Sequence, residues 1–197
     1  PAFVDPRTHT DFPFLRVVDG RVERHVPLSA EPLSCDVLIS SGSVVNLAAV
    51  AEIGGLDGDL FIDYVDYEWC LRARSRGWQV IGVPAVRMTH ELGDEVRRLF
   101  GRTVVLHSPR RQYYLVRNAL LLARRRSLPA GWRRHLLGRV LRQLAGYTLL
   151  CAPRLVRLDA MLRGALDGLS GRAGRCPLDR PPVPSAERLR PVPTLKF

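Results

Sequence analysis

The sequence predicts an α/β fold that is followed by amphipathic α-helices. In the first half of the chain, short apolar runs that end in small residues alternate with helix-forming stretches, which is typical of mixed α/β proteins. In the second half, apolar residues recur at helical spacing among many arginines. With 197 residues and 46% hydrophobic content, the chain can bury one sizeable core.

The first elements follow from local signals. Residues 1–34 contain several prolines and show little periodicity, so we expect loops and short extended pieces there. The segment CDVLISSGS, residues 35–43, predicts a strand that stops at small residues. Asn46 is the predicted N-cap of the helix LAAVAEI, and the two glycines after that stretch predict its end.

The stretch FIDYVDYEWCLRARSRG, residues 61–77, predicts a second helix with three carboxylates crowded at its start. Asp63 or Asp66 is expected to be the N-cap, because short acidic side chains accept hydrogen bonds from unpaired backbone N–H groups. Glu68 lies four residues before Arg72, a spacing that favours an ion pair on one helix face.

Two extended pieces, WQVIGVP and AVRMTH, are expected next, the second ending at His90. An arginine-rich amphipathic helix is predicted over residues 132–151, and a weaker one over residues 155–169. The proline-rich segment 171–197 is expected to be disordered or loosely draped.

Charge divides the chain into two halves. Residues 1–95 contain 8 arginines and 15 acidic residues, a net charge of −7, whereas residues 96–197 contain 22 basic and 4 acidic residues, a net charge of +18. This asymmetry indicates an acidic, cation-handling part joined to a part that meets polyanions.

The cysteines and the hydropathy limit where the protein works. The four cysteines lie far apart, which excludes a local zinc or thioredoxin-type motif and indicates reduced thiols in a cytosolic protein. No apolar stretch is long enough to cross a bilayer. The chain begins with Pro1 and shows no signal peptide, so we expect it to lack its natural N-terminus.

The carboxylate cluster in residues 61–77 has two interpretations. In the first, the acids meet the positive end of a helix dipole, and Glu68 and Arg72 form an ordinary surface pair. In the second, the acids bind a sugar: carboxylates accept hydrogen bonds from hydroxyl groups, and the interleaved Tyr64, Tyr67 and Trp69 cover apolar sugar faces. The interleaved aromatic residues favour the second interpretation.

These motifs resemble a known family. SSGSVVN, then IGGLDGDLFIDYVDYEWCLRARSRGWQVIGVP, then the histidine of MTH are similar to the second half of inverting family 2 glycosyltransferases, which have the GT-A fold. The segment LHSPRRQYYLVRNALLLARR, residues 106–125, is similar to the branch of rhamnosyltransferases that build bacterial surface polysaccharides from dTDP-L-rhamnose. The resemblance covers about residues 35–132.

The resemblance implies a domain organisation. Residues 35–105 would form the acceptor-binding half of the GT-A catalytic domain, and residues 1–34 would join it to a donor-binding half that is absent here. Residues 106–170 would form a basic helical region, followed by the tail. Family members carry a DxD-type metal motif in the donor half; Asp57-Gly58-Asp59 has that spacing but lies in another loop, so we do not expect it to be the motif.

The resemblance also implies catalytic roles. Asp66 matches the base that removes the proton from the acceptor hydroxyl, and Asp63 and Glu68 flank it, where they would bind the acceptor or orient the base. His90 matches a histidine that reaches a divalent metal ion, Mg²⁺ or Mn²⁺, which neutralises the departing diphosphate. Because Val65 stands where the family often has another acid, Asp63 remains the alternative base. Without the resemblance, His90 would be a partly buried strand-end residue.

Four further residues have two possible roles each. Arg72 would orient the base by holding Glu68, or would form a simple helix salt bridge. Trp69 would be a platform under the acceptor sugar, or part of the core. Ser41 and Gly42 would line the cleft between donor and acceptor, or form a turn at the end of a strand.

The expected partners are a dTDP-rhamnose donor and a glycan or lipid-linked acceptor. The basic helices 132–169 would dock on the anionic inner face of the plasma membrane, or would pack on the catalytic domain or on a second copy of the chain. A nucleic-acid-binding basic protein is an alternative that the charge suggests only weakly, because no zinc pattern, helix-turn-helix or aromatic β-platform accompanies the arginines, and we expect no nucleic-acid partner. A non-catalytic membrane-peripheral assembly module remains an alternative. The isolated chain is expected to be inactive.

Overall fold

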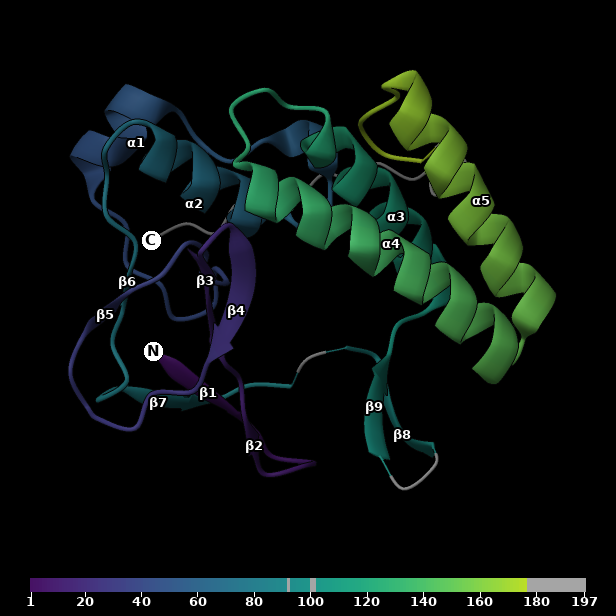
Figure 1. The fold of residues 1–197 in the computed structure, drawn as a ribbon, viewed down its shortest axis with the longest axis horizontal. Helices are drawn as coiled ribbons and strands as arrows, with labels where there is room; N and C mark the ends of the chain where they lie inside the picture. Colours follow the sequence, from purple (N-terminus) through teal and green to yellow (C-terminus); the bar gives the residue numbers. More distant parts are fainter. Residues whose placement is uncertain (92, 100–101, 177–197) are drawn as a thin grey trace, which may run out of the picture.

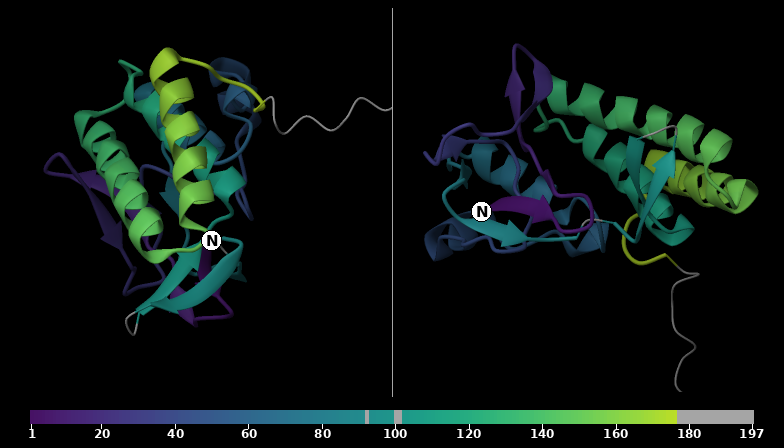
Figure 2. Two further views of the ribbon diagram at one scale, coloured as in Figure 1. Left: turned by 90° about the vertical axis from the view of Figure 1, so that its right-hand side faces the viewer. Right: turned by 90° about the horizontal axis from the view of Figure 1, so that it is seen from below.

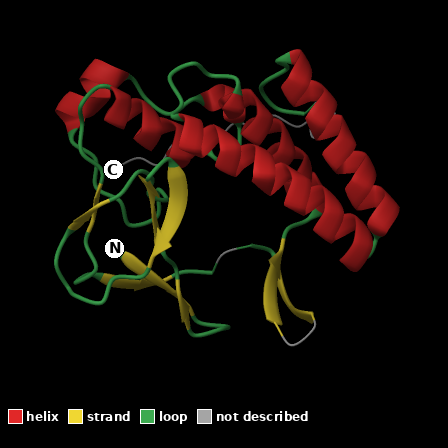
Figure 3. Cartoon of the chain, viewed as in Figure 1, coloured by secondary structure: helices red, strands yellow, loops and turns green. Residues whose placement is uncertain are grey.

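The computed structural model describes residues 1–91, 93–99 and 102–176. Small sheets lie on one side of the molecule, and a layer of three long helices lies on the other (Figures 1 and 3). The mixed α/β fold followed by helices that the sequence predicts is therefore confirmed.

The strands are short and pair in four small sheets. They are β1 (Ala2–Asp5), β2 (Thr10–Asp11), β3 (Phe14–Val18), β4 (Arg21–His25), β5 (Leu33–Ser34), β6 (Ile81–Gly82), β7 (Arg87–Thr89), β8 (Glu95–Leu99) and β9 (Arg102–Leu106). The helical elements are α1 (Leu47–Ile53), the 3-10 turn η1 (Gly58–Leu60), α2 (Val65–Ser75), α3 (Pro109–Ala123), α4 (Ala130–Leu150) and α5 (Arg154–Ser170).

Strand β1 positions the segment that ends at His90. It lies between β2, which is antiparallel, and β7, which is parallel, with Phe3 opposite Met88. The backbone N–H of His90 donates to the carbonyl of Val4 at 3.0 Å. The proline-rich start of the chain therefore contains a buried strand that fixes one of the predicted site residues.

The strand predicted at residues 35–43 is wrong in extent. Strand β5 ends at Ser34, and beyond it only Val37 makes an isolated antiparallel bridge, to Leu15. The buried Asp36 carboxylate accepts hydrogen bonds from the Val17 N–H and from the indole of Trp132, both at 2.8 Å, so side-chain bonds replace part of the strand ladder. Likewise, only Ile81–Gly82 of WQVIGVP forms a strand.

The first helix agrees with prediction and the second differs at its start. The side chain of Asn46 caps α1 by accepting from the Ala48 N–H at 2.9 Å. Helix α2 is capped by neither Asp63 nor Asp66: its N-cap is Tyr64, in the left-handed region at φ 63°, and no side chain makes a capping bond. Asp66 lies inside the first turn, where its carboxylate can point into a cavity.

The helical layer is centred on α3, which packs against both α4 and α5, and Figure 2 shows α4 and α5 running side by side. The glycines of α5 permit this close approach, because a Cβ at Gly164 would lie 2.4 Å from the Tyr113 carbonyl oxygen. The amphipathic helices predicted at residues 132–151 and 155–169 are confirmed. One face of α4 is buried in the core through Trp132 and Leu136.

The chain after α5 turns back onto the body. The Cys176 N–H donates to the hydroxyl of Tyr114 at 2.8 Å, and the Gly174 N–H donates to the Asp59 carbonyl at 2.6 Å. The prediction of a loose tail is therefore wrong for residues 171–176. The rest of that predicted tail lies outside the described residues.

Candidate functional site

A cavity of about 470 Å³ opens where the start of α2 meets α3, α4 and the end of β7. Four of the predicted site residues line it, Ser41, Asp63, Asp66 and His90, and so do Tyr64 and Tyr67, which were predicted to cover sugar faces. Their elements are distant in sequence, so the fold brings together an acidic pair and a histidine. Glu68, Trp69, Arg72 and Gly42 do not line this cavity.

A strained turn carries the two aspartates into the cavity. Phe61, Asp63 and Tyr64 all have φ of 63°, a left-handed conformation that non-glycine residues adopt at a cost of about 1–3 kcal/mol each. Such strain persists only where surrounding contacts fix it, and it tends to gather at functional sites.

Within the part of the chain that the structure describes, the hydrogen bonds to the Asp66 carboxylate come from backbone N–H groups. Its Oδ1 accepts from the Tyr67 N–H at 2.9 Å, and its Oδ2 accepts from the Ser40 N–H at 3.2 Å. Burial raises the pKa of Asp66 above its usual range, although these N–H groups act to lower it. Among the described residues, no arginine forms an ion pair with Asp66. A carboxylate with a raised pKa and no cationic partner is suited to accept a proton.

Asp63 is instead bound to an arginine. Arg111 of α3 donates to its two carboxylate oxygens, at 2.5 Å from Nη2 and 3.3 Å from Nε. The hydrogen bond to Asp63 is also the main cause of the raised pKa of Arg111. Asp63 therefore lies in an ion pair, whereas no described arginine pairs with Asp66.

Glu68 lies at the centre of a buried ion network. It is 4% exposed, and its carboxylate accepts from Arg72 Nε at 2.9 Å, from Arg72 Nη2 at 3.0 Å and from Arg125 Nη1 at 2.6 Å. Arg72 also donates to the carbonyls of Ile53, the last residue of α1, and of Gly55. The interpretation of Glu68 and Arg72 as an ordinary surface pair is wrong, because Glu68 is buried and the network joins the end of α1, helix α2 and the segment just after α3.

Trp69 and Gly42 lie beside the cavity. The Trp69 indole donates to the Gly54 carbonyl at 2.8 Å, and its ring lines a neighbouring cavity of about 280 Å³ that shares Ser40 and Asp66. Trp69 as a sugar platform stays a prediction. Gly42 has φ of 63°, and an added Cβ would lie 2.9 Å from the Met88 sulfur, so the turn at this position favours glycine.

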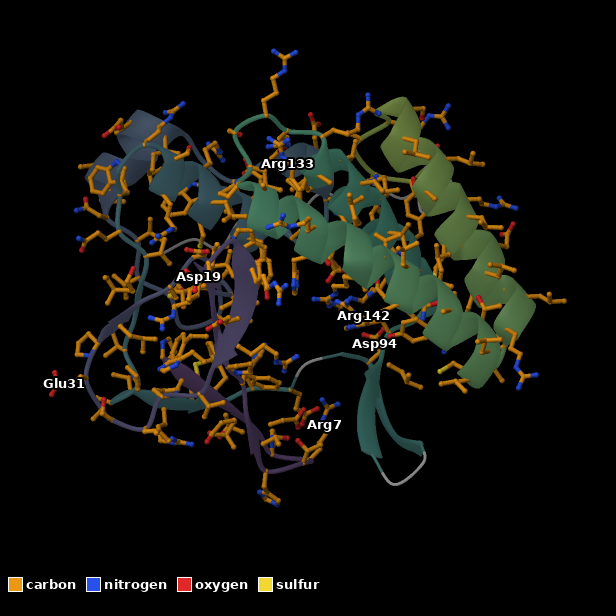
Figure 4. The ribbon with its side chains drawn as sticks, in the orientation of Figure 1. Arg7, Asp19, Glu31, Asp94, Arg133 and Arg142 are labelled. Carbon is orange, nitrogen blue, oxygen red and sulfur yellow. The ribbon has the colours of Figure 1, made fainter. Side chains whose placement is uncertain are left out.

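Three titratable residues that line the cavity were not predicted from the sequence: His107, Arg111 and Arg139. Burial is the main reason that the pKa of His107 falls to about 4, so this imidazole is neutral at pH 7. Arg139 of α4 lies 5.7 Å from the Tyr64 ring centre and has no ion-pair partner among the described residues. No local signal distinguishes Arg139 from the other arginines of α4, such as Arg142, which also extends from this helix (Figure 4).

These residues do not supply a full set of ligands for a divalent metal ion. In the described part of the chain, no three His, Cys, Asp or Glu side chains gather where they could hold a metal ion. His90 lies against the Phe3 ring, with 5.5 Å between ring centres. His90 could therefore be only one ligand among others from elsewhere. No helix in the described ranges is long and apolar enough to cross a membrane.

Comparison with known proteins agrees with the motifs. The chain is 35% identical over 181 residues to the dTDP-rhamnosyl transferase RfbF of Shigella flexneri, and the match covers 88% of this chain and 60% of that protein. No protein-family model and no solved structure matches the chain. The resemblance to rhamnosyltransferases is confirmed by this homologue, and the chain spans about three fifths of its length.

Proposed function

We propose that this chain forms the acceptor-binding half of an inverting, GT-A type rhamnosyltransferase that transfers L-rhamnose from dTDP-rhamnose to a glycan or lipid-linked acceptor. The observation that carries the proposal is Asp66, a carboxylate of raised pKa that lines a cavity and that no arginine of the described ranges pairs with. The name of the Shigella relative supports the donor.

The chemistry assigned to Asp66 is general-base catalysis. An acceptor hydroxyl in the cavity would donate a hydrogen bond to Asp66 and attack the anomeric carbon from the face opposite the diphosphate. Asp66 takes the hydroxyl proton as the new C–O bond forms and the bond to the diphosphate breaks, so the configuration inverts. The N–H groups of Ser40 and Tyr67 hold the carboxylate in place during this step.

Positive charge near the cavity would stabilise the negative charge that develops on the departing diphosphate. Arg139 lines the cavity, and the described residues offer it no carboxylate within ion-pair distance. Fixed cations that face developing negative charge lower the barrier without reorganisation. A metal ion remains part of the proposal, with His90 as the ligand that the described part of this chain would contribute.

The helices would bring the site to a membrane. One face of α4 is packed in the core, but several leucines on α4 and α5 remain exposed: Leu137, Leu141, Leu149, Leu155, Leu162, Leu166 and Leu169. Exposed arginines such as Arg142 and Arg154 lie on the same two helices. Exposed leucines with neighbouring arginines suit the surface of an anionic bilayer, here the cytoplasmic leaflet that holds a lipid-linked acceptor.

The reaction is tested with the complete transferase, dTDP-rhamnose and a lipid-linked acceptor. We expect a rhamnosylated product whose anomeric configuration, read by NMR, is opposite to that of the donor, and loss of transfer after metal chelation. A product of retained configuration contradicts the base role of Asp66. Absence of transfer from dTDP-rhamnose contradicts the proposed donor.

The membrane role is tested by sedimentation with vesicles. We expect binding to vesicles that contain phosphatidylglycerol and not to pure phosphatidylcholine. Leu162→Ser together with Leu166→Ser should weaken binding without loss of folding. Equal binding of this variant, or dimerisation through the same face in the absence of lipid, contradicts membrane docking.

A further inference from the structure

We propose that Asn118 of α3, oriented by Arg117, is a positioning residue that holds the strained turn at residues 60–63 and so aims Asp63 and Asp66 into the cavity. This inference rests on the proposed function for its catalytic consequence. The structural part, that one buried amide fixes the turn, can be tested without any activity.

The side-chain amide of Asn118 meets three carbonyls of one turn. Asn118 is 0% exposed, and its Nδ2 lies 2.9 Å from the Leu60 oxygen, 2.8 Å from the Ile62 oxygen and 2.9 Å from the Asp63 oxygen. An amide nitrogen carries only two hydrogens, so the three carbonyls share them. The carbonyls must therefore converge on one point, which restricts the turn to a narrow set of conformations.

The neighbouring Arg117 determines which way the amide faces. Its Nε donates to Asn118 Oδ1 at 2.9 Å, which leaves Nδ2 toward the turn. Its Nη2 donates to the Leu60 carbonyl at 2.9 Å, and its guanidinium lies 4.8 Å from the centre of the Tyr114 ring. Arg117 is 1% exposed, and no described carboxylate pairs with it.

The burial of Arg117 and Asn118 costs free energy unless their hydrogen bonds stabilise the turn. Burying a guanidinium and an amide removes both from water, and apolar side chains at the same positions would fill the core without that penalty. The hydrogen bonds of both side chains end on the 59–63 backbone or on the segment after α5, apart from the bond between them. The polar pair therefore serves the turn.

The turn at residues 60–63 is strained, so contacts from outside the turn must stabilise its conformation. Phe61, Asp63 and Tyr64 have left-handed backbones that non-glycine residues leave when they can. Without the Asn118 amide, the Ile62 and Asp63 carbonyls lose this donor while the Leu60 carbonyl keeps its bond from Arg117, and the turn can relax toward commoner backbone angles. Because Asp63 lies in the turn and Asp66 in the helical turn that follows, relaxation would move both carboxylates.

The first readout is hydrogen exchange of the amides at residues 61–66. We compare wild type with Asn118→Leu, which keeps the volume but removes the donors, and with Asn118→Ser, a milder change that can donate one bond. Leu122→Ala, also buried on α3 but without a hydrogen bond to the turn, is the control for lost stability. Faster exchange at 61–66 in the Asn118 variants alone supports the clamp. Unchanged exchange overturns it, whatever the activity.

The second readout is steady-state transfer by the complete enzyme. A base displaced by about 1 Å can cost roughly 100-fold in rate. We expect kcat to fall by about that factor in Asn118→Leu, and less in Asn118→Ser, with little change in KM for the donor. Leu122→Ala should keep kcat within about threefold while folded. A folded Asn118→Leu variant that matches this control overturns the positioning role.

The two proposals fail in different ways. If Asp66→Asn retains full turnover, the proposed base is wrong, and hydrogen exchange still decides whether Asn118 holds the turn. If Asp66→Asn is inactive while both Asn118 variants keep wild-type kcat, the base stands and the positioning role is overturned.

Discussion

Glu68→Gln tests the interpretation, one of the two left open by the sequence, that Glu68 acts through its ion pairs with Arg72 and Arg125 and does not bind the acceptor. The substitution keeps the shape of the side chain but removes the charge that two arginines share. Glutamine can accept through one oxygen only, so its NH₂ group must face a guanidinium donor. If Oε1 stays the oxygen, Arg72 Nη2 faces the NH₂ group and loses its acceptor, and both arginines lose the charge of their partner.

The magnitude follows from burial. Removing one partner of a fully buried ion pair costs about 3–5 kcal/mol. Here the Arg72 side chain is 25% exposed and that of Arg125 is 37% exposed, so water screens part of the loss. Arg125 also keeps its ion pair with Asp57. We therefore expect a loss of about 2 kcal/mol of unfolding free energy, which lowers Tm by about 4–8 °C for a chain of this size.

Asp159→Asn is the matched control, because Asp159 and Arg163 have the same i,i+4 spacing as Glu68 and Arg72. The side chains of this surface pair are 59% and 56% exposed, so its loss should cost no more than about 0.5 kcal/mol. Thermal unfolding followed by circular dichroism compares both variants with wild type. Equal Tm values for the two variants, or a Glu68→Gln variant of wild-type stability whose acceptor KM rises, would refute the reasoning.

Two further predictions concern packing and pH. Gly164→Ala should lower the unfolding free energy by about 2–3 kcal/mol, because its Cβ would press on the Tyr113 carbonyl. Gly146→Ala, on an open part of α4, should raise the unfolding free energy by about 0.5–1 kcal/mol. Denaturant titration compares the two variants, and equal effects contradict the close approach of α3 and α5. Turnover should fall as pH falls through the pKa of Asp66, because only the ionised form accepts a proton, and burial places this limb above the ordinary aspartate value of 3.8. Measurement of kcat/KM against pH checks this, and a limb at or below the ordinary value contradicts it.

The helices were predictable because their signals are local. The Asn46 cap and the two glycines define α1, and leucines at helical spacing define α4 and α5. Strands β6 and β7 lie within predicted extended pieces, but β1 was not predicted as a strand, since its parallel partner β7 lies far along the chain and such pairing leaves little trace in a short segment. The start of α2 was predicted wrongly, because tertiary contacts to the 60–63 turn replaced a side-chain cap.

The candidate site was predictable in part. Asp66 and His90, which the motifs singled out as site residues, line one cavity. The motifs left two roles open for Glu68, binding of the acceptor and orientation of the base. Only its burial between Arg72 and Arg125, which the sequence does not show, distinguishes between these roles. Arg139 could not be selected, because its role depends on how α4 crosses the site, and helical periodicity does not encode that crossing.

The central claim is that Asp66 accepts the proton of the acceptor hydroxyl. Its most direct test is rhamnose transfer from dTDP-rhamnose by the complete enzyme, with wild type, Asp66→Asn and Asp63→Asn compared at equal folded concentration. Asparagine at position 66 can keep the hydrogen bond from the Tyr67 N–H, so unfolding free energy should change by no more than about 1 kcal/mol.

The account predicts that Asp66→Asn is folded and loses turnover by at least about 100-fold, the lower range for general-base catalysis, while Asp63→Asn retains more activity. Equal turnover of wild type and Asp66→Asn would contradict the account, and loss confined to Asp63→Asn would move the base to Asp63.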